Sequence, residues 1–268
     1  MICEIMKPYN VIIILGPTAS GKTRLAAHAA AIVNGEIISA DSRQVYRNMN
    51  IGTGEDLNEY IINGSHIPYH LIDIADAGAS YNLDNYISDF HSAFISITSK
   101  NKMPVISGGT GLYINAVVKG FEYTNVPVDE ELRIKLNLLT HEELKQQLFK
   151  IPSTPFHQLA DITTVKRTIR AIEIAEWLNK NSHNKKIMPR LKPLTFGLDP
   201  GRQSRRLRIE NRLKQRLENG LIQEVESLLK AGVTKEKLIF YGLEYKFVVM
   251  YLDHKMSFDY LVEHLTIA

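Results

Sequence analysis

A glycine-rich segment near the N-terminus has the residue types and spacing of a phosphate-binding loop. It follows the pattern G-x-x-x-x-G-K-[ST] and comprises Gly16, Pro17, Thr18, Ala19, Ser20, Gly21, Lys22 and Thr23. Glycines let consecutive backbone N–H groups curl around an anion, which the positive end of the following helix also attracts. We expect Lys22 to reach phosphate oxygens and the Thr23 hydroxyl to bind Mg²⁺. A plain glycine turn would explain the fold but not the Lys-Thr pair.

Asp41 is the carboxylate that the sequence favours for acid–base chemistry. It follows a short apolar run and precedes Ser42, Arg43 and Gln44. An acceptor, a hydroxyl, a cation and an amide side by side are typical of a base that recognises and deprotonates a polar substrate. A turn or capping aspartate after a strand is the alternative. Two roles stay open for Asp73: a position near bound Mg²⁺, or a cap at the end of a strand.

The elements that must position these groups alternate between strands and helices. Apolar runs predict strands at 11–15, 36–39, 67–74 and 103–107. Helices are predicted after the phosphate loop, at 83–98 with Ser80 as N-cap, and at 111–118. Such alternation implies a parallel sheet, whose ligands lie beyond the carboxyl ends of the strands. Thr18, Asp41, Asp73 and Thr110, the last within a second glycine turn, should therefore converge.

A wholly helical pattern interrupts the alternation from about residue 128, and strand character returns at 191–198. Helices are then expected at 202–217 and 221–229, separated by Gly220. We predict an α/β fold: a P-loop NTPase-like core with a parallel sheet and an inserted all-helical subdomain. The boundaries are 1–127 for the first part of the core, 128–190 for the insertion and 191–268 for the return to the core with basic helices.

Positive charge is concentrated in one stretch. The net charge is +3, yet residues 1–120 hold 8 Lys/Arg against 10 Asp/Glu, whereas residues 163–216 hold 15 Lys/Arg against 4 Asp/Glu, a balance of +11. A block of this kind is commonly a solvated helix face, but beside a phosphate loop it favours a surface for nucleic acid.

Composition excludes several classes of protein. With 268 residues and 44% apolar residues the chain can bury a sizeable core. Its one cysteine, Cys3, excludes a disulfide framework and a cysteine-built zinc site. The first residues lack a signal-type pattern and no apolar run approaches membrane-spanning length, so we expect a cytoplasmic protein without membrane contact.

Five segments in order resemble one family over nearly the whole chain. They are the phosphate loop, Ile38 to Tyr46 (ISADSRQVY), Tyr69 to Asp73, Gly108 to Tyr113, and Arg167 to Glu173. The phosphate loop is shared by many families, whereas ISADSRQVY is nearly diagnostic. On these motifs the sequence resembles the tRNA dimethylallyltransferases, also called tRNA isopentenyltransferases.

The resemblance implies transfer of the dimethylallyl group from dimethylallyl diphosphate to N6 of the adenosine just 3′ of the anticodon. Asp41 matches the family's general base, and Lys22 and Thr23 with Mg²⁺ match its diphosphate cradle, to which Thr18 and Arg208 add contacts. Such a site needs a proton acceptor for the amine and cations for the leaving diphosphate. The positions similar to the family's tRNA contacts are Asp41, Ser42, Arg43, Gln44, Thr110, Arg133, Lys166, Arg167, Thr168, Ile169 and Arg170.

The resemblance also sets expectations for RNA binding. The target adenosine must leave the anticodon-loop stack and enter a channel between the core and the insertion. Family members usually continue beyond residue 268 into a basic, aromatic segment that helps to hold tRNA, so we expect weaker tRNA affinity without it. We expect the protein to act as a monomer on the tRNA anticodon stem-loop.

Three alternatives stay open at this point. An enzyme that prenylates free adenine nucleotides to form cytokinins would share the core. A P-loop kinase that binds ATP would share only the phosphate loop. A non-catalytic RNA-binding protein is the third alternative.

Overall fold

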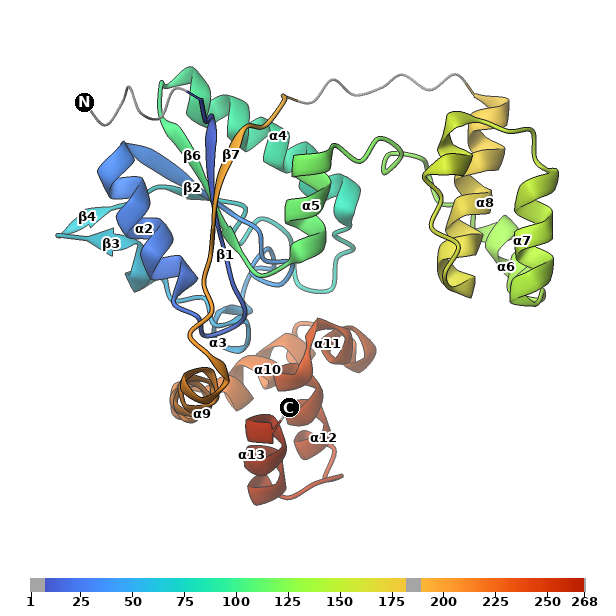
Figure 1. Ribbon diagram of the computed structural model, residues 1–268. Coiled ribbons are helices and arrows are strands. Elements are labelled where there is room, and N and C mark those ends of the chain that lie inside the picture. The colour runs from blue at the N-terminus through green and yellow to red at the C-terminus, as the bar shows by residue number, and fades with distance from the viewer. Residues whose placement is uncertain (1–7, 182–188, 268) are drawn as a thin grey trace. The chain divides into compact units, whose positions relative to one another are not determined.

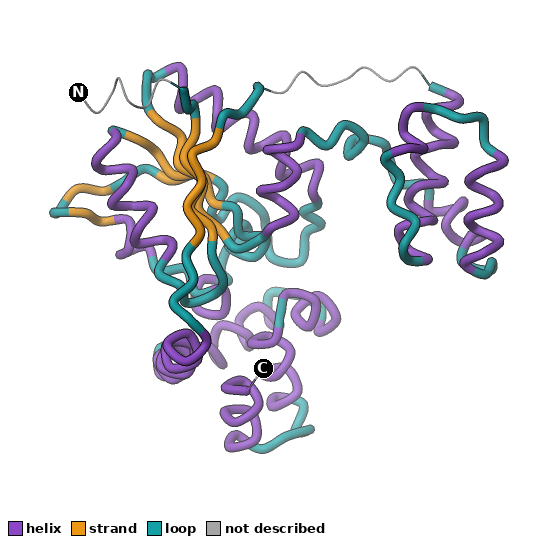
Figure 2. Tube along the Cα trace, in the orientation of Figure 1, coloured by secondary structure: helices purple, strands orange, loops and turns teal. Residues whose placement is uncertain are grey.

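The computed structural model describes residues 8–181 and 189–267. The chain forms two compact units, one comprising Met1–Gly120 with Pro189–Ala268 and the other Phe121–Met188. Figure 1 labels their elements, and Figure 2 shows that strands occur in the first unit while the second is built from helices and loops. The sequence places the insertion at 128–190, whereas the compact helical unit comprises Phe121–Met188.

The first unit contains a five-stranded parallel sheet of order β5-β2-β6-β1-β7. Its strands are β1 (Val11–Leu15), β2 (Gly35–Ser39), β5 (Tyr69–His70), β6 (Met103–Gly108) and β7 (Pro193–Gly197). β7 lies beside β1, with Ile13 opposite Thr195, so the chain returns to the same sheet after the helical unit. A small hairpin of β3 (Ile61–Ile62) and β4 (Ser65–His66) stands apart. This topology confirms the predicted α/β fold.

Helices cover both faces of the sheet. The helix α2 (Lys22–Val33) lies on one face, and α4 (Leu83–Ser99) and α5 (Gly111–Lys119) lie on the other (Figure 1). Three buried alanines of α2 pack against strand residues such as Ile12 and Ile37. On the other face Tyr86 of α4 stacks on Tyr113 of α5 with ring centroids 3.9 Å apart. Burial on both faces explains why the strands are continuous apolar runs.

Two details of the predicted elements were wrong. The strand expected at 67–74 pairs only at Tyr69–His70, because Leu71 and Asp73 have left-handed φ values of 63° and 54° that no strand accommodates. Asp73 therefore lies in a loop rather than at a strand end. The N-cap of α4 is Asn82, not Ser80, since the Asn82 side chain accepts a hydrogen bond from the backbone of Asn85 in a capping box.

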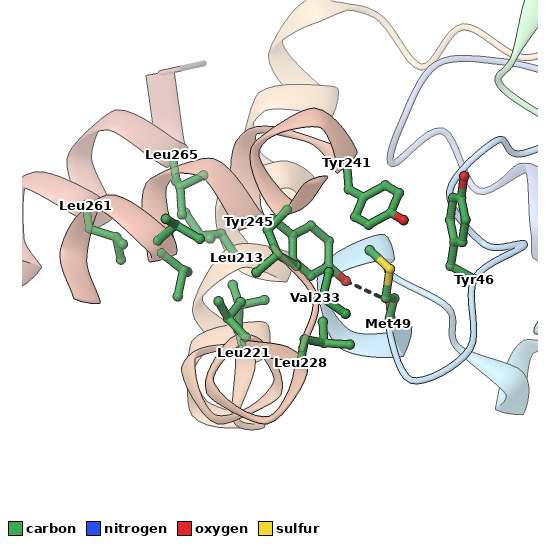
Figure 3. Packing of buried hydrophobic residues seen from close by; sticks show 14 of the residues in the cluster. Tyr46, Met49, Leu213, Leu221, Leu228, Val233, Tyr241, Tyr245, Leu261 and Leu265 are labelled. Carbon is green, nitrogen blue, oxygen red and sulfur yellow. Dashed lines mark hydrogen bonds between the residues drawn. The ribbon is translucent and has the colours of Figure 1, made fainter. Parts of the chain in front are cut away.

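Five C-terminal helices complete the first unit beyond the carboxyl ends of the strands (Figure 1). They are α9 (Arg202–Glu218), α10 (Leu221–Lys230), α11 (Lys235–Tyr241), α12 (Leu243–Leu252) and α13 (Phe258–Ile267). Their apolar faces form one core with the segment after β2, including Tyr46 and Met49 (Figure 3).

Polar contacts join these helices to α3 (Asn50–Thr53). The Tyr245 hydroxyl donates to the Met49 carbonyl at 3.0 Å (Figure 3) and lies 2.8 Å from the Glu224 carboxylate. Glu224 in turn accepts the backbone N–H groups of Ile51 and Gly52 at 2.8 and 2.9 Å, the free donors at the start of α3. The loop that carries the predicted catalytic segment is thereby held against the C-terminal helices.

The second unit packs α6 (Glu130–Leu136), α7 (His141–Lys150), the 3-10 helix η2 (Pro155–Gln158) and α8 (Val165–Lys180) around its own core. Leu136, Leu144, Phe156 and Ile172 belong to that core. Thr140 and Glu143 form a capping box at the start of α7. In the described part of the chain, no helix combines the length and apolar character needed to cross a membrane.

Candidate active site

The phosphate loop lies between β1 and α2, where the sequence places it. Gly21 has a left-handed φ of 86°, which glycine adopts without a steric penalty, and α2 begins at the next residue. The Lys22 ammonium folds back to the Pro17 carbonyl at 3.3 Å. Burial lowers the pKa of Lys22, while the charge of Asp41 raises it. The ammonium is thus partly desolvated and close enough to Asp41 to interact with its charge, a setting in which a phosphate group would be bound strongly.

A cleft of about 850 Å³ opens over this loop within the first unit. Its lining comprises residues 18–24, Asp41, Gln44, much of the segment 50–60 including the 3-10 helix η1 (Leu57–Tyr60), and one face of α9. The phosphate loop and Asp41 therefore share one cavity, because they follow the carboxyl ends of β1 and β2, two strands of one parallel sheet with β6 between them. Gly16 and Pro17 belong to the loop but do not line the cleft.

The turn at Asp41 is fixed by short hydrogen bonds. The Asp41 carboxylate accepts the backbone N–H of Arg43 at 3.0 Å, and the Thr110 hydroxyl accepts that of Ser42 at 3.0 Å. The backbone N–H of Thr110 donates to the Ala40 carbonyl at 3.1 Å. The structure thus brings together two segments that the sequence singled out separately. Asp41 is partly exposed and lines the cleft.

Arg208 reaches the phosphate loop from α9. Its guanidinium donates to the Ser20 carbonyl at 3.3 Å and lies 3.5 Å from the Ala19 carbonyl. Because α9 follows the helical unit in the sequence, this contact joins residues that are 188 positions apart. Arg208 therefore lies beside the phosphate loop and lines the same cleft.

Thr23 faces Glu59 of η1, whose carboxyl pKa is raised by burial and lowered by Thr23 and Arg212. Among residues 8–181 and 189–267, no group of three or more His, Cys, Asp or Glu side chains forms a metal site. Asp73 does not line the cleft. Its carboxyl lies near that of Glu55, and the burial of Glu55 together with the charge of Asp73 raises the pKa of Glu55 to about 8.

Some of the tRNA contacts predicted in the second unit are exposed side chains, and the others are buried or bind neighbouring residues of the unit. Lys166 and Arg167 are exposed, and Arg167 makes a 2.9 Å ion pair with Asp161 at the surface. Thr168 and Ile169 are only 0% and 5% exposed, so neither side chain is at the surface of this unit. Helical periodicity turns these two residues into the core of the unit, where the Thr168 hydroxyl donates to the Thr164 carbonyl.

Arg133 and Arg170 bind a buried carboxylate. The side chain of Glu173 is 1% exposed and accepts Arg133 Nε at 2.8 Å, Arg133 Nη2 at 3.0 Å and Arg170 Nη1 at 3.1 Å. Arg170 also donates to the Val126 carbonyl at 2.6 Å. Both arginines therefore have a structural role that the sequence analysis did not foresee.

The cleft contains further charged side chains that the sequence analysis did not assign. Arg212 and Arg216 follow Arg208 at intervals of four residues on α9, and Glu55 and Glu59 face them from the segment after α3. The four-residue spacing of the arginines was a usable signal, because it places them on one helical face. The carboxylates carried no such signal.

Comparison with known proteins identifies the family. The family model of the IPP transferases matches residues 44–268. A "tRNA dimethylallyltransferase 2" of Bacteroides fragilis is 49% identical over 98% of this chain and 85% of its own length. A "tRNA dimethylallyltransferase 1" of Parabacteroides distasonis is 46% identical over the same shares.

Solved structures agree with this result. The tRNA isopentenylpyrophosphate transferase of Bacillus halodurans matches with a TM-score of 0.68 and 30% identity, covering 96% of this chain and 82% of that one. A eukaryotic dimethylallyltransferase acting on tRNA matches with a TM-score of 0.74, and at 21% identity it supports the fold, over 96% of this chain and 66% of its own. The chain belongs to the IPP transferase family, the tRNA dimethylallyltransferases.

Proposed function

We propose that this protein transfers the dimethylallyl group of dimethylallyl diphosphate to N6 of the adenosine 3′ of the anticodon in tRNA. The observation that carries the proposal is the single cleft that holds both the phosphate loop and Asp41. Family membership supports the same chemistry, since the related proteins are named for it.

The proposed reaction is a substitution at the allylic carbon C1. The N6 lone pair forms the new C–N bond, the C1–O bond breaks, its electron pair leaves with the diphosphate, and the N6 proton passes to the Asp41 carboxylate. Asp41 serves as the base, because it lies in the cleft near the loop that would hold the leaving group. Lys22, Arg208 and the N-terminus of α2 would stabilise the charge that develops on the diphosphate.

Thr23 would hold Mg²⁺ together with oxygens of the diphosphate and water. This arrangement fits the site, since the first residues of α2 carry the Lys-Thr pair and Glu59 is the carboxylate that faces Thr23. When bound, the ion neutralises part of the diphosphate charge.

Exposed basic residues would bind the tRNA backbone. Lys166 and Arg167 in the second unit and the exposed arginines of α9 supply positive charge without deep burial. In the first unit Ser42, Arg43, Gln44 and Thr110 surround Asp41 and would contact the extruded adenosine. We further propose that the enzyme acts as a monomer in the cytoplasm, where its tRNA substrate lies.

The experiment that tests the proposal offers labelled dimethylallyl diphosphate with tRNA, AMP and ATP as separate acceptors. Label in tRNA, at the adenosine 3′ of the anticodon, is the expected result. Label in AMP or ATP alone would replace the proposal by an adenine-nucleotide prenyltransferase. Binding of tRNA without transfer to any acceptor would point to a non-catalytic RNA-binding protein.

A further inference from the structure

Helix α3 is capped by a residue from a distant part of the chain. The helix comprises Asn50–Thr53, and the side chain of its N-cap residue, Met49, makes no capping hydrogen bond. Glu224 of α10 supplies the cap instead. Its two carboxylate oxygens accept the backbone N–H groups of Ile51 and Gly52 at 2.8 and 2.9 Å. Hydrogen bonds to a charged acceptor are among the stronger ones in proteins, so this contact ties α3 to α10.

Tyr245 of α12 adds a second contact at the same place. Its side chain is 1% exposed, and its hydroxyl lies 3.0 Å from the Met49 carbonyl (Figure 3) and 2.8 Å from the Glu224 carboxylate. Burial and the charge of Glu224 raise the pKa of this hydroxyl, so it keeps its proton and serves as a donor. Gly52 permits the approach, because a Cβ atom there would overlap the Tyr245 ring. Glu224 and Tyr245 together form a clamp on α3, the α3 clamp.

The segment 41–54 joins the proposed base to the α3 clamp. Its first turn is fixed by Thr110, whose hydroxyl accepts the backbone N–H of Ser42. Its middle, including Tyr46, is buried in the core of the C-terminal helices (Figure 3). Its far end is α3 with the clamp. The residues of the segment that line the cleft are Asp41, Gln44, Asn50, Ile51, Thr53 and Gly54.

The α3 clamp acts at a distance from the reacting groups. Neither Glu224 nor Tyr245 lines the cleft, whereas both ends of the segment 41–54 do. The phosphate loop, by contrast, is carried by β1 and α2 and not by this segment. Loss of the clamp should therefore displace Asp41 relative to a bound diphosphate and leave the diphosphate site itself in place.

We propose that Glu224 and Tyr245 are positioning residues for the transfer reaction, holding the segment 41–54 so that Asp41 meets the N6 proton while the phosphate loop holds the diphosphate. This inference rests on the proposed function and deepens it. A base must lie within hydrogen-bond reach of the proton that it removes. A misplacement of about 1 Å can lower a rate about 10²-fold, even where the altered residue lies far from the reacting atoms. The clamp should therefore affect turnover more than binding.

The test compares turnover with ligand binding in Glu224→Gln and Tyr245→Phe. With labelled dimethylallyl diphosphate and tRNA, the kcat of Glu224→Gln should fall about 10- to 100-fold, because an amide has one accepting oxygen where the carboxylate has two. Tyr245→Phe keeps the ring but loses the hydroxyl, so its kcat should fall about 3- to 10-fold. The KM for dimethylallyl diphosphate, and the calorimetric affinity for inorganic pyrophosphate with Mg²⁺, should both stay within about twofold.

Matched controls come from the same two helices. Glu226→Gln on α10 and Tyr251→Phe on α12 make the same chemical changes at residues outside the cleft and the clamp. Both controls should leave turnover and binding unchanged. Thermal unfolding of every variant defines a temperature at which each one is folded, and Tyr245→Phe decides the question if Glu224→Gln does not fold.

Hydrogen exchange gives a second readout that needs no activity. In Glu224→Gln the backbone amides of the segment 41–54 should exchange faster than in the unchanged protein, because two of them lose part of their acceptor. The amides of the phosphate loop, residues 16–23, should exchange at the same rate in both proteins. Unchanged exchange in 41–54 would overturn the inference.

A kcat that is unchanged in both folded variants would also overturn the inference. The same holds for a parallel loss of turnover and pyrophosphate affinity, because the clamp would then support the whole cleft rather than the position of the base. In these cases transfer of label to tRNA by the unchanged protein would leave the proposed function standing. If the unchanged protein transferred no label to tRNA, the proposed function would fail, and this inference with it.

Discussion

Replacement of Arg133 should destabilise the helical unit, because this side chain pairs with the buried carboxylate of Glu173. The side chain of Glu173 is 1% exposed, and Arg133 donates two of its hydrogen bonds, at 2.8 and 3.0 Å. Arg133→Ala would leave this buried carboxylate with one bond from Arg170 and one from the Asp129 backbone. Breaking a buried ion pair from one side costs about 3–5 kcal/mol. That is a large part of the ~5–15 kcal/mol by which domains are stable.

Trp177 offers an assay that reports on this unit alone. It is the only tryptophan of the chain, and it packs against the core of the second unit. In urea, the Trp177 fluorescence transition of Arg133→Ala should come at a lower midpoint, by an amount that corresponds to about 3 kcal/mol or more.

Arg167→Ala is the matched control. The side chains of Arg167 and Asp161 are 60% and 51% exposed, and exposed ion pairs contribute only about 0–1 kcal/mol. The Trp177 transition should therefore stay nearly unchanged, while the salt slope of tRNA binding should fall by roughly 0.7 to 0.9 for the lost phosphate contact. An unchanged transition in Arg133→Ala, or tRNA binding that is unaffected by Arg167→Ala, would refute the division between structural and RNA-binding arginines.

Three further predictions concern the first unit. Burial raises the pKa of Glu36, but hydrogen bonds from Lys102 and His70 outweigh it and hold the value at about 2. Since the folded pKa lies below the unfolded one, this stabilisation is present above about pH 4.5. The free energy of unfolding, measured against pH, should fall by about 3 kcal/mol between pH 5 and 2. Glu36→Gln should remove that pH dependence. Asp41→Ala should lower turnover about 10²- to 10⁴-fold with tRNA affinity retained, and a near-normal rate would leave Asp41 as a turn residue. Lys22→Ala and Thr23→Ala should weaken dimethylallyl diphosphate binding and alter its Mg²⁺ dependence, measured by equilibrium binding; tight binding of ATP alone, with transfer of its γ-phosphate, would favour a kinase instead.

Local patterns in the sequence determined the class of fold and the phosphate loop. The glycine loop, its preceding strand and its following helix depend on residues close together in the chain, so their spacing alone predicts them. The segment ISADSRQVY identified the family in the same way. The order of strands and helices implied a parallel sheet, and the edge where strands end implied that Asp41 and the loop lie near each other.

Only the tertiary structure decided which charged side chains are available. Arg133, Arg167 and Arg170 look alike in the sequence, yet two of them bind the buried Glu173 and one is exposed. The approach of α9 to the phosphate loop, which places Arg208 and Arg212 in the cleft, joins residues about 190 positions apart. Helical spacing predicts which residues share a face, but burial and ion pairing depend on which other element packs against that face, and local sequence does not contain that information.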